Sequence, residues 1–249
     1  MSAIAPMPDG GYAYVPGVFQ YSAGVVALPG HAIERVTFMQ PVPLEEGFTR
    51  IEEHLRRIGR PLTAFCGCEL RSPGQFTEEG FRAFNEVYVG TLERWGIFRG
   101  GVNPVARSNV CPEVNEPPTP SFYAFAYTIP SERPGTTFQV AGSGEAPEGQ
   151  GDYRNNTVRL GDLSAEGIAE KARWVLGEME RRLSALGAGW SDVTATQLYT
   201  VHDIHHVMAP EIEARGAARH GLIWHYARPP VVNLEYEMDC RCILTEHVV

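Results

Sequence analysis

The apolar positions of this 249-residue chain form two helical stripes and a series of short runs in its first half. Apolar residues spaced three and four apart predict helices over 44–59 and 76–95. Short runs rich in β-branched and aromatic residues predict strands at 18–22, 24–28, 35–39, 62–70, 105–110 and 122–129. Residues 1–17 are rich in Pro and Gly, so we expect a loose arm there.

The second half repeats this order of elements. A helical stripe covers 165–186, with Ser164 as its expected N-cap, and a shorter helix is predicted over 203–214. Strands are expected at 137–141, 158–160, 193–200, 222–226 and 231–243. A turn-rich segment, 130–135, separates the two halves.

Short local sequences also recur between the halves. Glu46-Gly47-Phe48 is echoed by Glu166-Gly167-Ile168, and Ala106-Arg107-Ser108 by Ala227-Arg228-Pro229, each about 120 positions later. This interval exceeds the roughly 20–50 residues of a solenoid repeat. We therefore predict an α+β fold of two tandem domains, residues 1–132 and 133–249, each with a mixed sheet packed on two helices.

Charge and cysteine usage narrow the class of protein. The formal net charge of −9 argues against binding to nucleic acid or anionic membranes, and no apolar run approaches the roughly 20 residues that span a bilayer. We expect a cytoplasmic protein. The chain has five cysteines, whereas a small secreted domain held by disulfides has an even number. Cys66 and Cys68 should share one face of a strand, as should Cys240 and Cys242, and buried structural thiols are favoured over redox or metal roles.

Several short segments together resemble a known family. They are Val140-Ala141-Gly142-Ser143-Gly144, the stretch 187–193 ending in Asp192-Val193, Ala227-Arg228-Pro229, and the closing Tyr236-Glu237-Met238-Asp239-Cys240. In this order and spacing they make the second half similar to the RidA/YjgF family of reactive-intermediate deaminases. The first half is a more distant match, through Phe84-Asn85-Glu86-Val87-Tyr88 and Ala106-Arg107-Ser108-Asn109-Val110.

The resemblance implies two RidA-like (chorismate-mutase-like) domains, a homo-oligomer built as a trimer of two-domain chains, and no cofactor. The chain looks most like the tandem members of the family that resemble 2-aminomuconate and 2-amino-5-chloromuconate deaminases. Such an enzyme would hydrolyse an enamine or imine of a 2-amino-dienoic dicarboxylate to the 2-oxo or 2-hydroxy acid and ammonia, in the degradation of aromatic compounds. Its partner would be a small carboxylate substrate.

This chemistry needs an arginine fork to hold a carboxylate, a group that transfers protons, and a pocket that positions one water molecule. By the resemblance, Arg228 and Arg107 are the anchors and Glu237 moves protons; we favour Arg228, since its half also contains Glu237. The first half lacks a carboxylate in its closing strand, so a composite pocket between the domains is natural. The substrate-binding candidates are Asn85, Ser108, Cys111, Gly142 and Ser143.

Other interpretations stay open. Either arginine could pair with an interface carboxylate, Glu237 could be a solvated edge charge, and Asp239 could be structural. The histidines at 202, 205, 206 and 225 suggest a metal hydrolase, but the H-E-x-x-H pattern is missing and we predict no metal site. A non-catalytic binder of small acids and a chorismate-cleaving hydrolase are further alternatives on the same fold.

Overall fold

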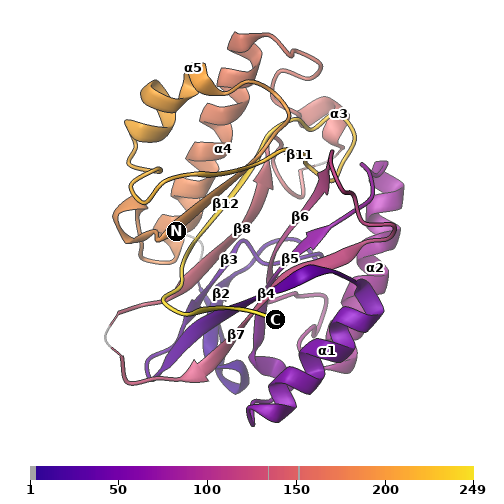
Figure 1. The fold of residues 1–249 in the computed structure, drawn as a ribbon, viewed down its shortest axis with the longest axis vertical. Helices are drawn as coiled ribbons and strands as arrows, with labels where there is room; N and C mark the ends of the chain where they lie inside the picture. Colours follow the sequence, from indigo (N-terminus) through magenta and orange to yellow (C-terminus); the bar gives the residue numbers. More distant parts are fainter. Residues whose placement is uncertain (1–3, 134, 151) are drawn as a thin grey trace.

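The computed structural model describes residues 4–133, 135–150 and 152–249. The protein has an α+β fold with two mixed sheets (Figure 1). The six-stranded sheet has the order β11-β6-β5-β7-β4-β13. Its strands are β4 (His31–Pro43), β5 (Phe65–Arg71), β6 (Ala106–Pro112), β7 (Ser121–Pro130), β11 (Ala227–Arg228) and β13 (Glu246–Val248).

The seven-stranded sheet has the order β1-β2-β3-β8-β12-β9-β10. Its strands are β1 (Ala5–Met7), β2 (Tyr12–Val15), β3 (Gly24–Ala27), β8 (Phe138–Gly144), β9 (Ala195–Tyr199), β10 (Ile223–His225) and β12 (Glu237–Cys242). The helices are α1 (Leu44–Arg57), α2 (Glu78–Arg94), α3 (Tyr153–Asn156), α4 (Ala165–Ala185) and α5 (His205–Val207). A π-helix, Met208–Glu213, continues α5, and short 3-10 turns lie at Pro8–Gly10, Leu62–Ala64 and Trp190–Asp192.

Three apolar clusters hold the layers together. One lies between α1, α2 and the six-stranded sheet, and a second lies between α4, α5 and the seven-stranded sheet. A third cluster, which includes Val25, Ile33 and Ala141, joins the two sheets face to face. The helices therefore cover the outer faces, with α4 and α5 at the top of Figure 1 and α1 and α2 at its lower right.

The two halves of the chain build sheets with the same connectivity. In the first half β5 is parallel to β6 and antiparallel to β7, which is antiparallel to β4. In the second half β9 is parallel to β10 and antiparallel to β12, which is antiparallel to β8. Each half also extends the other sheet: β3 pairs with β8, β11 with β6, and β13 with β4.

Local signals explain the helix ends. The Thr77 and Ser164 side chains accept hydrogen bonds from the backbone N–H groups of Gly80 and Gly167, so both residues are N-caps. The prediction for Ser164 is confirmed. Glu45 and Glu46 occupy the first turn of α1, where carboxylates interact favourably with the helix dipole. Among the residues that the structure describes, no helix is both long and apolar enough to cross a bilayer.

Five sequence predictions are wrong in detail. The expected loose arm contains β1 and β2, which pair with each other and with β3; residues 1–3 lie outside the described residues. The predicted strand at 18–22 forms only isolated bridges, and the one at 158–160 is a turn. The predicted strand 231–243 begins only at Glu237, and the helix expected over 203–214 is a short α-helix followed by a π-helix.

The cysteine pair in β5 also differs from the prediction. Cys66 packs between the sheets, whereas Cys68 packs on the helix side. The register of β5 against β7 shifts between Phe65 and Gly67, which breaks the simple alternation of a strand. Cys240 and Cys242 both contact the core under α4, as expected.

Candidate active site

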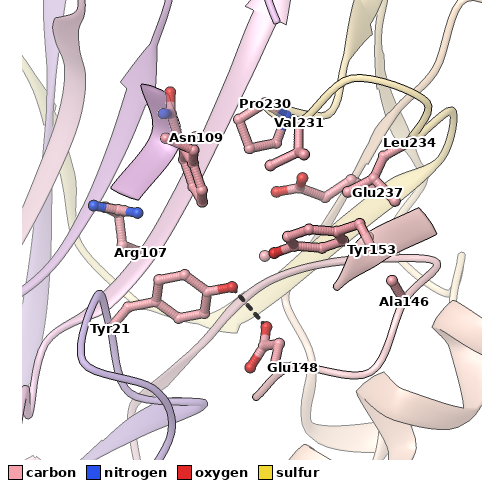
Figure 2. A pocket seen from close by; sticks show the side chains of 13 residues that line it. Tyr21, Arg107, Asn109, Ala146, Glu148, Tyr153, Pro230, Val231, Leu234 and Glu237 are labelled. Carbon is pink, nitrogen blue, oxygen red and sulfur yellow. Dashed lines mark hydrogen bonds between the residues drawn. The ribbon is translucent and has the colours of Figure 1, made fainter. Parts of the chain in front are cut away.

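A pocket lies where β6 of the first half meets β8 and β12 of the second. Thirteen residues line it, and they come from six separate segments of the chain. Figure 2 shows Arg107 and Tyr21 on one side, with Glu237 and Tyr153 facing them from the other. The pocket is therefore composite, because neither half alone supplies its walls.

Arg107 lies on β6 and is 1% exposed. Within the described part of the chain, none of its three guanidinium nitrogens has a hydrogen-bond partner. Its guanidinium carbon instead lies over aromatic rings, 4.7 Å from the centroid of Tyr88 and 5.3 Å from that of Tyr21. Phe81 and Phe84 complete this cage at 5.7 and 5.8 Å. Such rings attract a cation but leave its N–H donors unsatisfied, so these donors are available to an anion in the pocket.

Glu237 opens β12 and is 4% exposed. It pairs across the strands with Gly144 of β8, and its carboxylate lies so close to Gly142 that a β-carbon there would overlap it. Burial raises the pKa of Glu237 well above the usual 4.5, and the nearby charges of Asp239 and Glu148 raise it further. Arg182 opposes this effect only in part. The carboxyl group therefore keeps its proton to a higher pH than an ordinary glutamate and can act as an acid.

The second acidic side chain of the pocket, Glu148, differs from Glu237 in its partners. Tyr21 Oη donates a hydrogen bond to Glu148 Oε1 at 2.7 Å, as drawn in Figure 2. Arg182 Nη2 donates to the same oxygen at 2.8 Å. Arg182 Nη1 also donates to the carbonyl oxygens of Ala141 and Gly142 at 3.1 and 3.2 Å, which ties this network to β8. Glu148 is thus a paired carboxylate, whereas Glu237 has no hydrogen bond from a described side chain.

One wall of the pocket is apolar. Phe81, Ala146, Val231 and Leu234 form a buried cluster against which Tyr153 packs. Gln75 fixes the loop above it, because its Nε2 donates to the carbonyl oxygens of residues 229, 231 and 234 at 2.9–3.0 Å. This wall limits the access of bulk water and strengthens electrostatic interactions inside the pocket.

Arg107, Gly142 and Glu237 all line this one pocket, as the sequence analysis expects of substrate-contacting residues. Glu237 is not an edge charge, since β12 lies between β8 and β9. Asp239 is buried between the sheets, where its carboxylate accepts hydrogen bonds from Ser108, Gln197 and Tyr199.

The other substrate-binding candidates lie outside the pocket lining. Ser108 points to the opposite face of β6 and donates to Asp239. Asn85 is buried on α2, where its Nδ2 donates to the Phe81 carbonyl oxygen at 2.7 Å. Cys111 is buried on β6, and burial raises the pKa of its thiol to about 12. Ser143 donates to the adjacent carbonyl oxygen of Gly144 at 3.2 Å.

The position of Arg228 differs from the one that the sequence analysis expects. It lies on β11, opposite Cys111, and its guanidinium binds Glu113 at 2.8 Å and Glu235 at 2.7 Å. These are the ion pairs of the alternative interpretation. The strand that corresponds to β6 is β10, and β10 ends at His225 before the chain crosses to the other sheet. Arg107 and Arg228 therefore do not occupy equivalent positions.

The sequence analysis missed most of the pocket lining, including Tyr21, Asn109, Glu148 and Tyr153. Asn109 could have been found, because it lies two residues after Arg107 on a strand and so shares its face. Glu148 and Tyr153 lie in the irregular segment after β8, where no periodicity predicts the direction of a side chain.

The histidines have separate roles. Three of them, at positions 202, 205 and 206, bind different groups: the Glu235 carboxylate, the Asp203 carboxylate and the Ala165 carbonyl oxygen. His225 stacks on Tyr199 with 5.0 Å between ring centroids. Across residues 4–133, 135–150 and 152–249, no group of three or more His, Cys, Asp or Glu has the arrangement of a metal site.

Fold and pocket together indicate an α+β enzyme in which an arginine faces a buried carboxyl group with a raised pKa. Residues 4–247 match the family described as 2-aminomuconate deaminase CnbZ, and the chain belongs to this family. It is 54% identical over 253 residues to the 2-amino-5-chloromuconate deaminase of Comamonas testosteroni, a match that covers 98% of this chain and 100% of the relative.

Similarity to solved structures is weaker. A chorismatase is 12% identical, with 93% of this chain and 77% of that chain covered and a TM-score of 0.49. TdcF of E. coli with bound serine is 15% identical, with 44% of this chain and 81% of that chain covered and a TM-score of 0.33. Both scores are low, so the family assignment rests on the sequence matches.

Proposed function

We propose that this protein is a deaminase of the 2-aminomuconate type. It hydrolyses the enamine or imine of a 2-amino-dienoic dicarboxylate to the 2-oxo or 2-hydroxy acid and ammonia, in the degradation of aromatic compounds. The observation that carries the proposal is that Arg107 and Glu237 line the same pocket: a buried guanidinium without a hydrogen-bond partner among the described residues faces a carboxyl group whose pKa is raised. Membership in the family and the name of the 54%-identical relative support the substrate class.

The reaction proceeds through the imine tautomer of the substrate. The carboxylate next to the amino-bearing carbon binds the Arg107 guanidinium, whose planar fork matches it. Glu237 gives its proton to the imine nitrogen as water adds to the C=N carbon, and it takes a proton back from the added water, which yields the carbinolamine. Glu237 then gives this second proton to the amino nitrogen, and the C–N bond breaks as the hydroxyl group loses its proton to Glu237 and becomes the carbonyl. Both protons of the water thus reach the nitrogen, so the sum is imine plus water to oxo acid plus ammonia.

Arg107, not Arg228, is the proposed anchor. Among the described residues that line the pocket, Arg107 is the only cation. The Arg228 guanidinium, in contrast, already binds two carboxylates, Glu113 through Nε and Glu235 through Nη1.

We further propose that residues 1–132 and 133–249 are two RidA-like domains that exchange edge strands. The shared strand order of the two halves supports this proposal. We expect three such chains to form a trimer, and light scattering of the purified protein would test this assembly. The cytoplasm is the expected location.

The decisive assay adds purified protein to 2-aminomuconate and to 2-amino-5-chloromuconate and measures ammonia with a coupled dehydrogenase. One ammonia should appear per substrate consumed, and Glu237→Gln should abolish the signal. Saturable binding of the substrate without ammonia release would instead indicate a non-catalytic binder. Cleavage of chorismate would indicate the hydrolase alternative, and loss of activity with a chelator would indicate a metal enzyme.

A further inference from the structure

The chain contains one lysine, Lys171, and buries it completely. It lies on α4, where its Nζ donates to Glu145 Oε1 at 3.2 Å and to the Val158 carbonyl oxygen at 2.8 Å. Both members of this ion pair have side chains that are 0% exposed. Buried lysines are rare and costly to desolvate, so a position that keeps the only lysine of a chain needs an explanation.

The partner, Glu145, connects two segments that are far apart in sequence. Its Oε1 accepts the backbone N–H of Glu235 at 2.7 Å, and its Oε2 accepts that of Tyr236 at 3.1 Å. Its own carbonyl oxygen accepts the Val158 N–H at 2.9 Å. One buried carboxylate therefore joins the end of β8 to the residues that lead into β12.

Both of these segments are walls of the pocket. Gly144 and Ala146, on either side of Glu145, line it, and Tyr236 directly precedes Glu237. Neither Lys171 nor Glu145 is among the lining residues, so neither touches the substrate. We propose, on the basis of the proposed function, that the Lys171–Glu145 pair is a positioning device that fixes Glu237 against Gly142 and sets the charge around it.

The ion pair also contributes to the electrostatics of Glu237. The groups that act on Glu237 are Asp239, Glu148 and Glu145, which are acidic, and Arg182, which opposes them; Tyr153 and Cys111 lie within reach of its charge. Burial raises the pKa of Glu145, and Lys171 counteracts this effect. Without Lys171, the pKa of Glu145 would rise further, so Glu145 would place less negative charge beside Glu237. The pKa of Glu237 would then fall.

The test compares Lys171→Met with Val175→Ala. Methionine keeps the length of the side chain but removes its charge; Val175 lies one turn further along α4, equally buried, and faces the core of the seven-stranded sheet. In Lys171→Met we expect kcat for 2-aminomuconate to fall about 10- to 100-fold with little change in KM, because a displaced proton donor loses rate and not binding. In the plot of kcat against pH for Lys171→Met, the alkaline decline should begin at lower pH than in the wild type. Val175→Ala should keep both kcat and the position of this decline despite its lower melting temperature.

A second measurement does not depend on turnover. In hydrogen exchange followed by mass spectrometry, Lys171→Met should exchange faster than Val175→Ala in the peptides that cover 144–158 and 233–238. If these peptides exchange alike in the two variants, the pair does not fix the walls, and the proposal is wrong whatever the substrate. If exchange rises but kcat and its alkaline decline match those of Val175→Ala, the pair is structural only. Failure of the wild-type protein to release ammonia would refute the proposed function, while the exchange result would still decide whether the pair holds the pocket walls.

Discussion

The corresponding strands of the two halves carry complementary chemistry. In the first half β6 contains Arg107, but β7, from Ser121 to Pro130, contains no Asp or Glu. In the second half β10 is Ile223-Trp224-His225 and contains no arginine, whereas β12 begins with Glu237. Each half lacks the group that the other contributes, and the two groups meet in one pocket. The pocket therefore depends on residues from both halves of the chain.

The second helix of each half also differs between the halves. The 17-residue helix α2 presents Phe81, Phe84 and Tyr88 to the Arg107 guanidinium. Its counterpart in the second half is α5, three residues long and continued by a π-helix. The aromatic cage around an arginine is therefore a feature of α2 in the first half, whereas Arg228 of the second half lies in ion pairs.

The largest expected effect is that of Glu237→Gln. It keeps the shape of the side chain but removes the transferable proton, so kcat should fall by a factor of about 10²–10⁴ while KM changes little. Steady-state kinetics of ammonia release would measure this effect. A variant with near-wild-type kcat would mean that another group moves the protons and that the second half does not supply the acid.

Arg107→Ala comes next. Removal of the anchor should cost about 2–5 kcal/mol of interaction with the substrate carboxylate, seen as a fall in kcat/KM. Arg107→Lys should recover only part of the loss, because an ammonium group lacks the planar fork. The same kinetics would show this, and equal kcat/KM for Arg107→Ala and wild type would remove the first half from the site.

The pH dependence tests the protonation of Glu237. The pKa of this group is raised, so its acid form is present at low pH and is lost as pH rises through the raised value. Activity that needs the acid should fall on the alkaline side by about tenfold per pH unit, and Glu237→Gln should lack this limb.

The raised pKa of Glu237 also has a consequence for stability. Between the ordinary pKa near 4.5 and the raised value, the folded protein binds more protons at this site than the unfolded chain does. The contribution of Glu237 to stability therefore falls as pH rises through this window. Glu237→Gln should have a higher melting temperature than wild type above the window, and an unchanged melting temperature there would contradict the raised pKa.

Gly142→Ala should have a smaller effect. The new methyl group would overlap the Glu237 carboxylate and lie 3.2 Å from the Ser108 Cα, so the proton donor must move. We expect kcat to fall about 10-fold or more, since small displacements of reacting groups are costly. Gly177→Ala is the matched control, because nothing lies within 4 Å of the added methyl group on α4. If both variants keep full activity, Glu237 is not held where the mechanism requires it.

Arg228→Ala should have the smallest effect of the series. Its side chain is 30% exposed, and partly exposed ion pairs contribute only about 0–1 kcal/mol to stability. Turnover should stay within about twofold of wild type, because the residue lies outside the pocket lining. Chemical denaturation and kinetics of the same sample would measure both quantities. Loss of activity in Arg228→Ala with retention in Arg107→Ala would reverse the assignment of the anchor.

The sequence by itself determined the elements with strong local signals and the inventory of reactive groups. The helical stripes of α1, α2 and α4 depend on residues three and four apart, and the Ser164 cap on residues three apart, so short stretches of sequence contain the information. The order of strands and helices in each half came from the same local patterns, and the resemblance to the RidA/YjgF family supplied the candidates Arg107 and Glu237.

Tertiary structure alone decided which of these groups meet. The pairing of β3 with β8, of β11 with β6 and of β13 with β4 joins residues that lie more than 100 positions apart in the chain. Such pairings depend on the burial of whole sheet faces, which no local pattern specifies. They bring Tyr21 and Glu148 into the pocket, draw Arg228 out to Glu113 and Glu235, and place an arginine from one half opposite a carboxyl group from the other.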